Sequence, residues 1–152
     1  MILFRKVINV DLDLDIIEAK MLSMRLPGFY KDELSLREWL IKVSTKGTLI
    51  SAIEDNKLVG LLGFYANDMA TKKAFLTLIV VDEEHQGTGL GSRLFNKFVS
   101  MSRDAGMAVC ELNVVKTNVK AILFYERKGL TVDGQGNDTH HYKMVGPLEK
   151  NV

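Results

Sequence analysis

A long apolar segment that runs into alternate glycines constrains this chain more than any other feature. Residues 74–81 are nearly all apolar, as expected of a strand covered on both faces of a sheet. A turn with glycines at positions 87, 89 and 91 follows this segment. Apolar residues then recur at helical spacing: Leu90, Leu94, Phe98 and Met101. The sequence therefore predicts a central strand, a tight turn and an amphipathic helix that ends at Gly106.

The other segments predict an alternation of strands and helices without any linker. The expected strands are 2–10, 48–53, 57–65, 74–81, 109–115, 130–132 and 139–145. The expected helices begin in the acidic run 11–15, near Ser35, after the glycine turn and at residue 119. In the first helix, the expected apolar stripe is Leu12, Ile16, Ala19 and Leu22. The order β-α-α-β-β-β-α-β-α-β-β predicts one α+β domain over 1–152, with a mixed, mostly antiparallel sheet flanked by helices.

Composition excludes several classes of protein. Twenty Lys+Arg against 19 Asp+Glu give a net charge of +1, which argues against a nucleic-acid binder and a polybasic membrane binder. No apolar stretch reaches the length of a bilayer span. The one cysteine, Cys110, permits no intrachain disulfide, and we expect it to be buried in a strand of a cytoplasmic protein. Three histidines and one cysteine without metal-ligand spacing predict no metal site.

The glycine turn has the chemistry of a pyrophosphate cradle. Glycines allow a close backbone approach, and the first N–H groups of the following helix lack internal partners at the positive end of the helix dipole. The spacing fits neither the P-loop nor the G-x-G-x-x-G dinucleotide fingerprint. By itself the turn leaves two interpretations equally open: a ligand site, and a tight turn that binds nothing.

Two motifs resolve that ambiguity through a family resemblance. Residues 86–91, Gln-Gly-Thr-Gly-Leu-Gly, match the pattern [RQ]-x-x-G-x-[GA] of the GNAT superfamily of N-acetyltransferases. Residues 118–130 match its second pattern, N-x-x-A-x-x-x-Y-x-x-x-G-[FL]. Both motifs occur in the family's order, and the predicted elements resemble the GNAT fold along essentially the whole chain. The resemblance implies an enzyme that uses acetyl-CoA to acetylate a primary amine by direct attack.

The resemblance also implies a role for individual residues. Backbone groups of Ile79, Val80 and Val81 would line the pantetheine arm and the acetyl group. The turn and the helix start would hold the pyrophosphate: Gln86, Gly87, Thr88, Gly89, Leu90, Gly91 and Ser92. Asn118 would bind pantetheine or cap its own helix. Tyr125 would lie near the cofactor sulfur and protonate the leaving thiolate, against the alternative of a packed core tyrosine.

The general base is where the chain departs from the family. Relatives often place a glutamate twelve residues before the tyrosine, or eleven before the first motif residue. Those positions here are Asn113 and Phe75. Glu111 shares a strand face with Asn113, so the two could hold a water that carries the proton. A structural polar pair is an equal alternative. A base role for the adjacent His140 and His141 ranks lower than an ordinary place in an alternating strand.

The acceptor amine is not encoded in any specific motif. In the GNAT fold that the motifs resemble, residues 26–33 and 133–138 would wall its site, with Phe29 and Tyr30 as stacking surfaces and Glu33 and Asp138 as charges that attract an amine. For each of these residues taken alone, a solvated loop charge or a partly buried aromatic is the favoured interpretation. A small metabolite, an amino sugar and a protein amine stay open as acceptors. A homodimer through strand edges is an expectation from the fold. The second function to test is a non-catalytic acyl-CoA-binding module, which the missing carboxylates favour.

Overall fold

The computed structural model describes residues 1–7, 15–21 and 33–149. The strands are β1 (Leu3–Lys6), β2 (Thr48–Glu54), β3 (Lys57–Asp68), β4 (Lys73–Val81), β5 (Val109–Val115), β6 (Thr131–Gln135) and β7 (His141–Pro147). The helices are α2 (Glu33–Lys46), α3 (Leu90–Asp104) and α4 (Val119–Arg127), with a 3₁₀ turn η1 (Glu83–His85). Residues 15–21 are helical as well. No helix in these ranges is both long and apolar enough to cross a bilayer.

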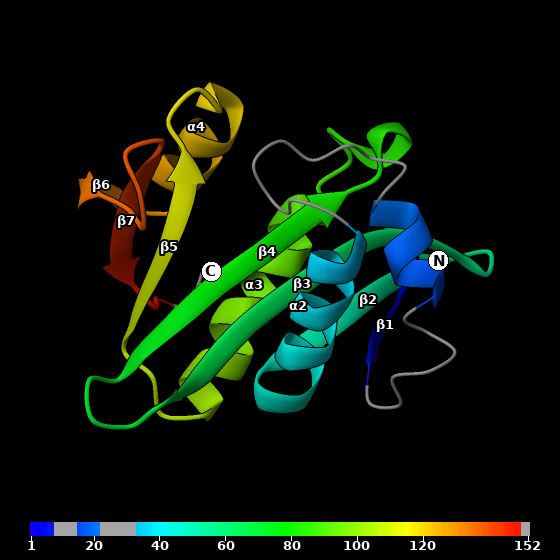
Figure 1. Cartoon of the computed structure of the whole chain (residues 1–152), viewed down its shortest axis with the longest axis horizontal. Helices are drawn as coiled ribbons and strands as arrows, with labels where there is room; N and C mark the ends of the chain where they lie inside the picture. The colour runs from blue at the N-terminus through cyan, green and yellow to red at the C-terminus, as the bar shows by residue number, and fades with distance from the viewer. Residues whose placement is uncertain (8–14, 22–32, 150–152) are drawn as a thin grey trace. The chain divides into compact units, whose positions relative to one another are not determined.

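The strands form one mixed sheet in the order β1-β2-β3-β4-β5-β7-β6 (Figure 1). The pairs β1/β2, β2/β3, β5/β7 and β6/β7 are antiparallel. β4 and β5 are parallel, with Lys73–Phe75 opposite Val109–Glu111. The predicted α+β architecture with a mostly antiparallel sheet is therefore confirmed, including the order of its elements.

Contacts divide the chain into two compact units. The first unit comprises Met1–Tyr65 and Leu78–Phe95, and the second comprises Ala66–Thr77 and Asn96–Val152. Three elements, β3, β4 and α3, continue from one unit into the other. The glycine turn belongs to the first unit, whereas β5, α4, β6 and β7 belong to the second.

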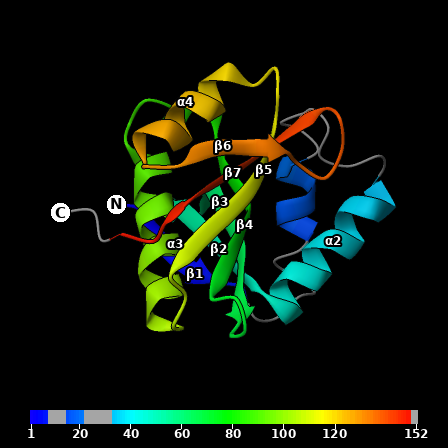
Figure 2. The same cartoon turned by 90° about the vertical axis from the view of Figure 1, so that its left-hand side faces the viewer.

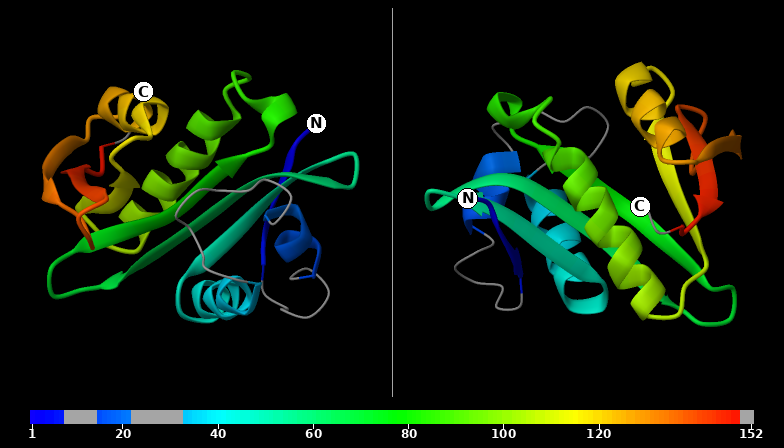
Figure 3. Two further views of the ribbon diagram at one scale, coloured as in Figure 1. Left: turned by 45° about the horizontal axis from the view of Figure 1, so that its top comes forward. Right: turned by 180° about the vertical axis from the view of Figure 1, so that it is seen from behind.

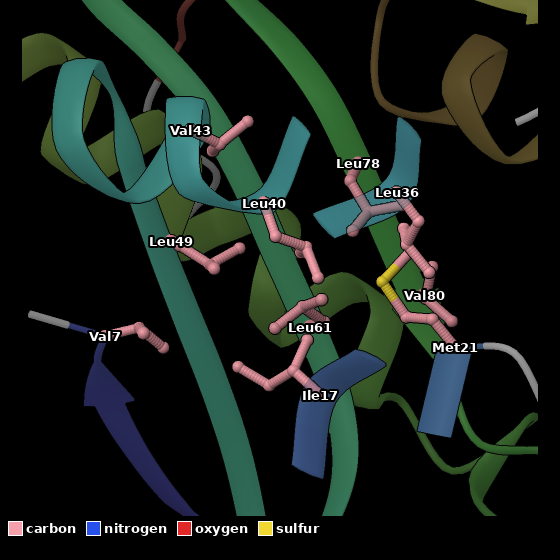
Figure 4. Packing of buried hydrophobic residues seen from close by; sticks show 10 residues of the cluster. All are labelled: Val7, Ile17, Met21, Leu36, Leu40, Val43, Leu49, Leu61, Leu78 and Val80. Atoms are coloured by element: carbon pink, nitrogen blue, oxygen red, sulfur yellow. The ribbon is translucent and has the colours of Figure 1, made fainter. Parts of the chain in front are cut away.

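The core of the first unit lies between α2, the helical residues 15–21 and the sheet (Figure 4). α2 buries Leu36, Leu40 and Val43, which follow one another at helical spacing. The other buried members of this cluster are Val7, Ile17, Met21, Leu49, Leu61, Leu78 and Val80. β4 thus contributes its apolar side chains to this core just before it enters the glycine turn.

The stripe expected for the first helix was wrong by one position. Ile16 is 61% exposed and Ala19 is exposed too, whereas Ile17 and Met21 are buried. Ile17 and Met21 are four residues apart and together bury more apolar surface than a stripe containing Ala19 would, so the helix turns that face inward. Leu12 and Leu22, the other two residues of the expected stripe, lie outside the described ranges.

Element boundaries follow local chemistry in most places. Asp55 and Asn56 both have positive φ, 50° and 63°, as a two-residue hairpin turn between β2 and β3 requires. Asn118 caps α4 by accepting a hydrogen bond from the Ala121 N–H at 3.2 Å, as expected. Ser35 does not begin its helix, because α2 already starts at Glu33.

The second unit contains β5, β7 and β6 in that order, with α4 directly after β5 (Figure 2). β5 alternates between half-buried and buried residues, and Cys110, Leu112 and Val114 are the buried ones. The final hairpin begins and ends later than predicted, because β6 continues through an irregularity after Val132. Gly134, with φ of 83°, lies within this irregularity.

Truncation of one buried leucine tests the core of the first unit. Leu40 is 0% exposed and Ile41, its neighbour on α2, is 39% exposed. We expect Leu40→Ala to lower the free energy of unfolding by about 2–5 kcal/mol, because it removes buried methyl groups and leaves a cavity. Ile41→Ala should change it by about 0.5 kcal/mol or less. Urea denaturation measures both, and equal losses would contradict this assignment of the core.

Candidate active site

The glycine turn connects β4 to α3 through η1 (Figure 3). Gly87 and Gly89 have φ of 79° and 89°, values that residues with a side chain rarely adopt. A Cβ atom added at either position would meet nothing within 4 Å. Glycine is therefore needed for the backbone conformation rather than to relieve crowding, and the space beside the turn is open to a ligand.

Five backbone donors within residues 87–92, around the helix start, have no acceptor in the part of the chain that the structure describes. They are the N–H groups of Gly87, Gly89, Leu90, Gly91 and Ser92, with only the Thr88 N–H between them engaged. The first bond of α3 comes from the Arg93 N–H to the Gly89 carbonyl, at 3.0 Å. Unpaired donors at the positive end of a helix favour an anion. The predicted cradle thus has the donor set that a pyrophosphate needs.

Contacts within the first unit hold this turn in place. The Thr88 N–H and hydroxyl both donate to the His85 carbonyl, and Gln86 Nε2 donates to the Val81 carbonyl at 3.3 Å. On β3, a Cβ added at Gly60 would lie 3.2–3.3 Å from the side chains of Leu90 and Leu94. The absence of a side chain at Gly60 therefore lets the start of α3 pack closely against the strand.

A group of charged side chains lies around η1, at the start of the turn. His85 Nε2 is 3.1 Å from Glu54 Oε1, and its Nδ1 is 3.7 Å from Asp82 Oδ2. Asp82 also pairs with Lys20 Nζ at 2.9 Å. Hydrogen bonding to Glu54 raises the pKa of His85 above its usual value, and the same bond lowers the pKa of Glu54. These pairs anchor η1 to the β2–β3 hairpin and to the helical residues 15–21.

Sequence reasoning missed this group. His85 and Glu54 come from segments 31 residues apart, and no sequence spacing indicates such a pair. A local signal does exist for Asp82 and His85, because residues three apart lie close together in a helical turn.

In the second unit, Tyr125 on α4 lies in an environment that keeps its hydroxyl protonated. Burial, and secondly the neighbouring thiol of Cys110, raise the pKa of Tyr125 far above its usual value. Its ring meets Phe124 edge-on at a centroid distance of 5.3 Å. Burial also raises the pKa of Cys110 to about 11, so this thiol is not an active nucleophile at neutral pH. Cys110 is fully buried, as expected.

Glu111 and Asn113 lie on one face of β5, opposite the buried residues Cys110 and Leu112. Glu111 Oε1 is 3.7 Å from Lys73 Nζ. Asn113 Oδ1 approaches Gly136 so closely that a Cβ there would lie 2.5 Å from it. The shared face is confirmed, but no hydrogen bond between the two side chains occurs among the described residues. Their joint role as a water-mediated base stays a prediction.

Two of the predicted cofactor residues can contribute only backbone groups, because their side chains are buried. The side chains of Val80 and Leu90 are buried in the first unit, whereas Ile79 and Val81 are partly exposed. Asn118 uses its side-chain oxygen to cap α4. Its backbone carbonyl already accepts the Ile122 N–H. The side-chain amide nitrogen is therefore the group of Asn118 best placed to bind a ligand.

The segments expected to wall the acceptor site are described only in part. Phe29 and Tyr30 lie outside the described residues, as does most of 26–33. Asp138 accepts hydrogen bonds from the His140 N–H at 2.8 Å and from His141 Nδ1 at 2.7 Å. The bond from His141 holds the pKa of Asp138 below its usual value. The carboxylate of Asp138 thus binds His141 of the same chain, so its charge is already paired in this structure.

Comparison with known proteins identifies the family. A sequence profile of the Acetyltransferase (GNAT) family matches residues 15–130, which include both the glycine turn and Tyr125. This chain belongs to the GNAT acetyltransferase family. GNAT acetyltransferases use acetyl-CoA, in keeping with the donor set of the turn. An uncharacterized N-acetyltransferase of Methanocaldococcus jannaschii is 31% identical over 96 residues. That match covers 60% of this chain and 42% of the relative's length.

Solved structures share the GNAT fold at low sequence identity. Ard1 from Thermoplasma volcanium superposes with a TM-score of 0.75 at 20% identity, over 96% of this chain and 97% of that one. PaiA N-acetyltransferase from Thermoplasma acidophilum, in complex with coenzyme A, gives 0.74 at 18% identity, over 97% and 99%. The ribosomal-protein-S18-alanine N-acetyltransferase from Escherichia coli gives 0.73 at 19% identity, over 97% and 94%.

Substitution of one turn glycine tests whether the unpaired donors bind a cofactor. We expect Gly89→Ala to weaken CoA binding at least tenfold, because a residue with a side chain disfavours the φ of 89° and displaces the donors. The matched control is Gly134→Ala, which imposes a similar backbone strain at φ of 83° within the irregular strand β6. Both variants should lose about 1–2 kcal/mol of stability. Calorimetry with CoA separates them, and equal affinities would contradict the assignment.

The pair of His85 and Glu54 predicts a pH dependence of stability. The raised pKa of His85 means that its contribution is complete below its unfolded pKa and is lost as pH rises through the folded pKa. We therefore expect the stability advantage of the native chain over His85→Gln to be larger at pH 6 than at pH 9. Urea denaturation at both pH values measures this advantage. Glu54→Gln should show the same trend, and an advantage that is constant with pH would exclude the pair as its source.

Proposed function

We propose that this chain transfers an acetyl group from acetyl-CoA to a primary amine by direct attack. The observation that carries the proposal is a set of five N–H groups, at Gly87, Gly89, Leu90, Gly91 and Ser92, that find no acceptor among the described residues. Each of these donors is satisfied by water or by a ligand, and the positive end of the helix dipole favours an anionic ligand. Acetyl-CoA carries a pyrophosphate for these donors and supplies an activated thioester.

The residues of the first unit support binding of the donor substrate. The turn holds the pyrophosphate, and backbone groups of Ile79, Val80 and Val81 line the pantetheine and the acetyl group. A backbone N–H that stabilises developing negative charge in a water-poor site is worth about 3–4 kcal/mol in other enzymes. In the second unit, Asn118 provides an amide group for the pantetheine.

Tyr125 acts in this proposal as the general acid. Its strongly raised pKa keeps the phenol protonated at neutral pH, so that it has a proton to give to the leaving sulfur. Its side chain is half-buried, which limits the access of bulk water to the phenol. The alternative of a core tyrosine predicts a loss of stability on substitution and no specific loss of turnover.

The acceptor in this proposal is a primary amine of one of three classes: a small metabolite, an amino sugar or a protein amine. Among the structural neighbours, one is named a ribosomal-protein-S18-alanine N-acetyltransferase and another a nourseothricin acetyltransferase. Sequence identities of 19% and 23% to these neighbours do not choose between acceptors for this chain. The second candidate function is a non-catalytic acyl-CoA-binding module, which Phe75 and Asn113 favour because neither can accept a proton.

Release of CoA in the presence of an amine panel tests the proposal. We expect acetyl-CoA and CoA, but neither ATP nor NAD, to raise the melting temperature, by several degrees when present at about 100 times the dissociation constant. We expect at least one amine to release CoA. Tyr125→Phe should lower kcat by about 10²–10⁴-fold and leave acetyl-CoA affinity unchanged.

The outcomes separate the two functions. Binding of acetyl-CoA without turnover on any amine would favour the acyl-CoA-binding module. Absence of binding would contradict both functions. Unchanged turnover in Tyr125→Phe, with an active native chain, would remove only this residue from the mechanism.

A further inference from the structure

Asp138 and His141 form a carboxylate–imidazole pair at the beginning of β7. His141 Nδ1 lies 2.7 Å from Asp138 Oδ1, and the His140 backbone N–H donates to the same oxygen at 2.8 Å. The backbone of His141 holds the loop as well, because its N–H donates to the Asp138 carbonyl and its carbonyl accepts the Gly136 N–H. The side chain of His141 is 16% exposed. Its ring is therefore fixed, yet still accessible.

The pair determines which ring nitrogen carries the proton. A carboxylate can only accept a hydrogen bond, so the close contact with Asp138 requires the hydrogen on Nδ1. The lowered pKa of Asp138 keeps it ionised at neutral pH. In the neutral imidazole, Nε2 then holds the lone pair. A carboxylate in this position also stabilises the imidazolium that forms when Nε2 takes up a proton.

The sheet register places His141 next to Asn113. His141 is opposite Val115, and Lys143 is opposite Asn113, so all four residues lie on the face of β5 and β7 away from Leu112 and Met144. The Cβ position of an alanine at Gly136 would be 3.0 Å from His141 Cβ and 2.5 Å from Asn113 Oδ1. His141 and Asn113 thus pack around the same glycine.

The other charged groups around His141 are less suited to accept a proton. Glu111, on the same face, lies 3.7 Å from Lys73, and Asp133 lies 3.5 Å from Lys143. Each of these carboxylates is thus already engaged by a lysine ammonium group. Lys116 lies over the ring of Tyr142, on the opposite face. His140 is exposed and enters the pair only through its backbone.

We propose that His141, held by Asp138, is the general base that deprotonates the acceptor ammonium in the acetyl transfer proposed above. An alkylamine is largely an ammonium ion at neutral pH and has no lone pair for attack until it loses a proton. In this step an N–H bond of the ammonium breaks and an Nε2–H bond forms, while the amine nitrogen keeps the electron pair. The imidazolium then returns its proton to water. Asp138 is a positioning residue, since it acts through His141.

Kinetics of adjacent histidine variants test this role, which rests on the proposed function. With an amine that the native chain acetylates, we expect His141→Gln to lower kcat/KM for the amine about 10²–10⁴-fold. The acidic limb of the pH–rate profile should disappear with it. The matched control, His140→Gln, should leave rate and profile unchanged. Asp138→Asn keeps an oxygen that can accept both hydrogen bonds but removes the charge, so it should lower the rate less than His141→Gln does.

Two further readouts keep the outcome unambiguous. Calorimetry should give acetyl-CoA affinities within twofold of the native value for all three variants. In ¹⁵N NMR spectra at pH 8, His141 should carry its hydrogen on Nδ1, and Asp138→Asn should weaken that preference. An Nε2–H tautomer in the native chain would overturn the proposal, as would His141→Gln with native kinetics. If the native chain binds acetyl-CoA but acetylates no amine, the proposed transferase function fails first, and the base falls with it.

Discussion

Unpaired backbone donors at the start of α3 are the constraint on which the rest of the first unit depends. Five N–H groups without acceptors among the described residues cost stability unless water or an anion satisfies them. The surrounding contacts fix the turn that carries them. Gly60 lets α3 pack closely against β3, and the His85 carbonyl accepts a hydrogen bond from the Thr88 hydroxyl. The ion pairs of His85 with Glu54 and of Asp82 with Lys20 tie this arrangement to the end of β2 and to the helical residues 15–21.

Strongly patterned elements could be predicted from the sequence almost to the residue. β5 and the start of α4 lie where alternation and the Asn118 cap placed them, because both signals are local. The glycine turn was equally clear, since a φ near 80–90° at Gly87 and Gly89 excludes most other residues. The family signature is local in the same sense, because it consists of residues at fixed spacing in two short motifs, whereas composition is common to many families.

Features that depend on distant partners could not be predicted in this way. The inward face of residues 15–21 is chosen by what the sheet and α2 offer, and it moved from Ile16 to Ile17. The bond between His85 and Glu54 joins segments without any common spacing. Asp138 and His141 differ from these, because they are only three residues apart. The same spacing separates Asp82 and His85, so each of these two pairs has a local sequence signal. Their chemistry depends on packing that only the structure supplies.

The anchored glycine turn has a thermodynamic consequence for recognition. A loop already fixed by hydrogen bonds and ion pairs loses little conformational entropy when a ligand arrives, so most of the interaction energy appears as affinity. The donors are backbone dipoles, and the adjacent Arg93 lies 5.0 Å from the ring of Phe4. In the proposed binding mode, the phosphates would therefore be recognised by directed hydrogen bonds from a fixed backbone more than by mobile cationic side chains. Such binding loses less strength as ionic strength rises than binding through surface lysines does.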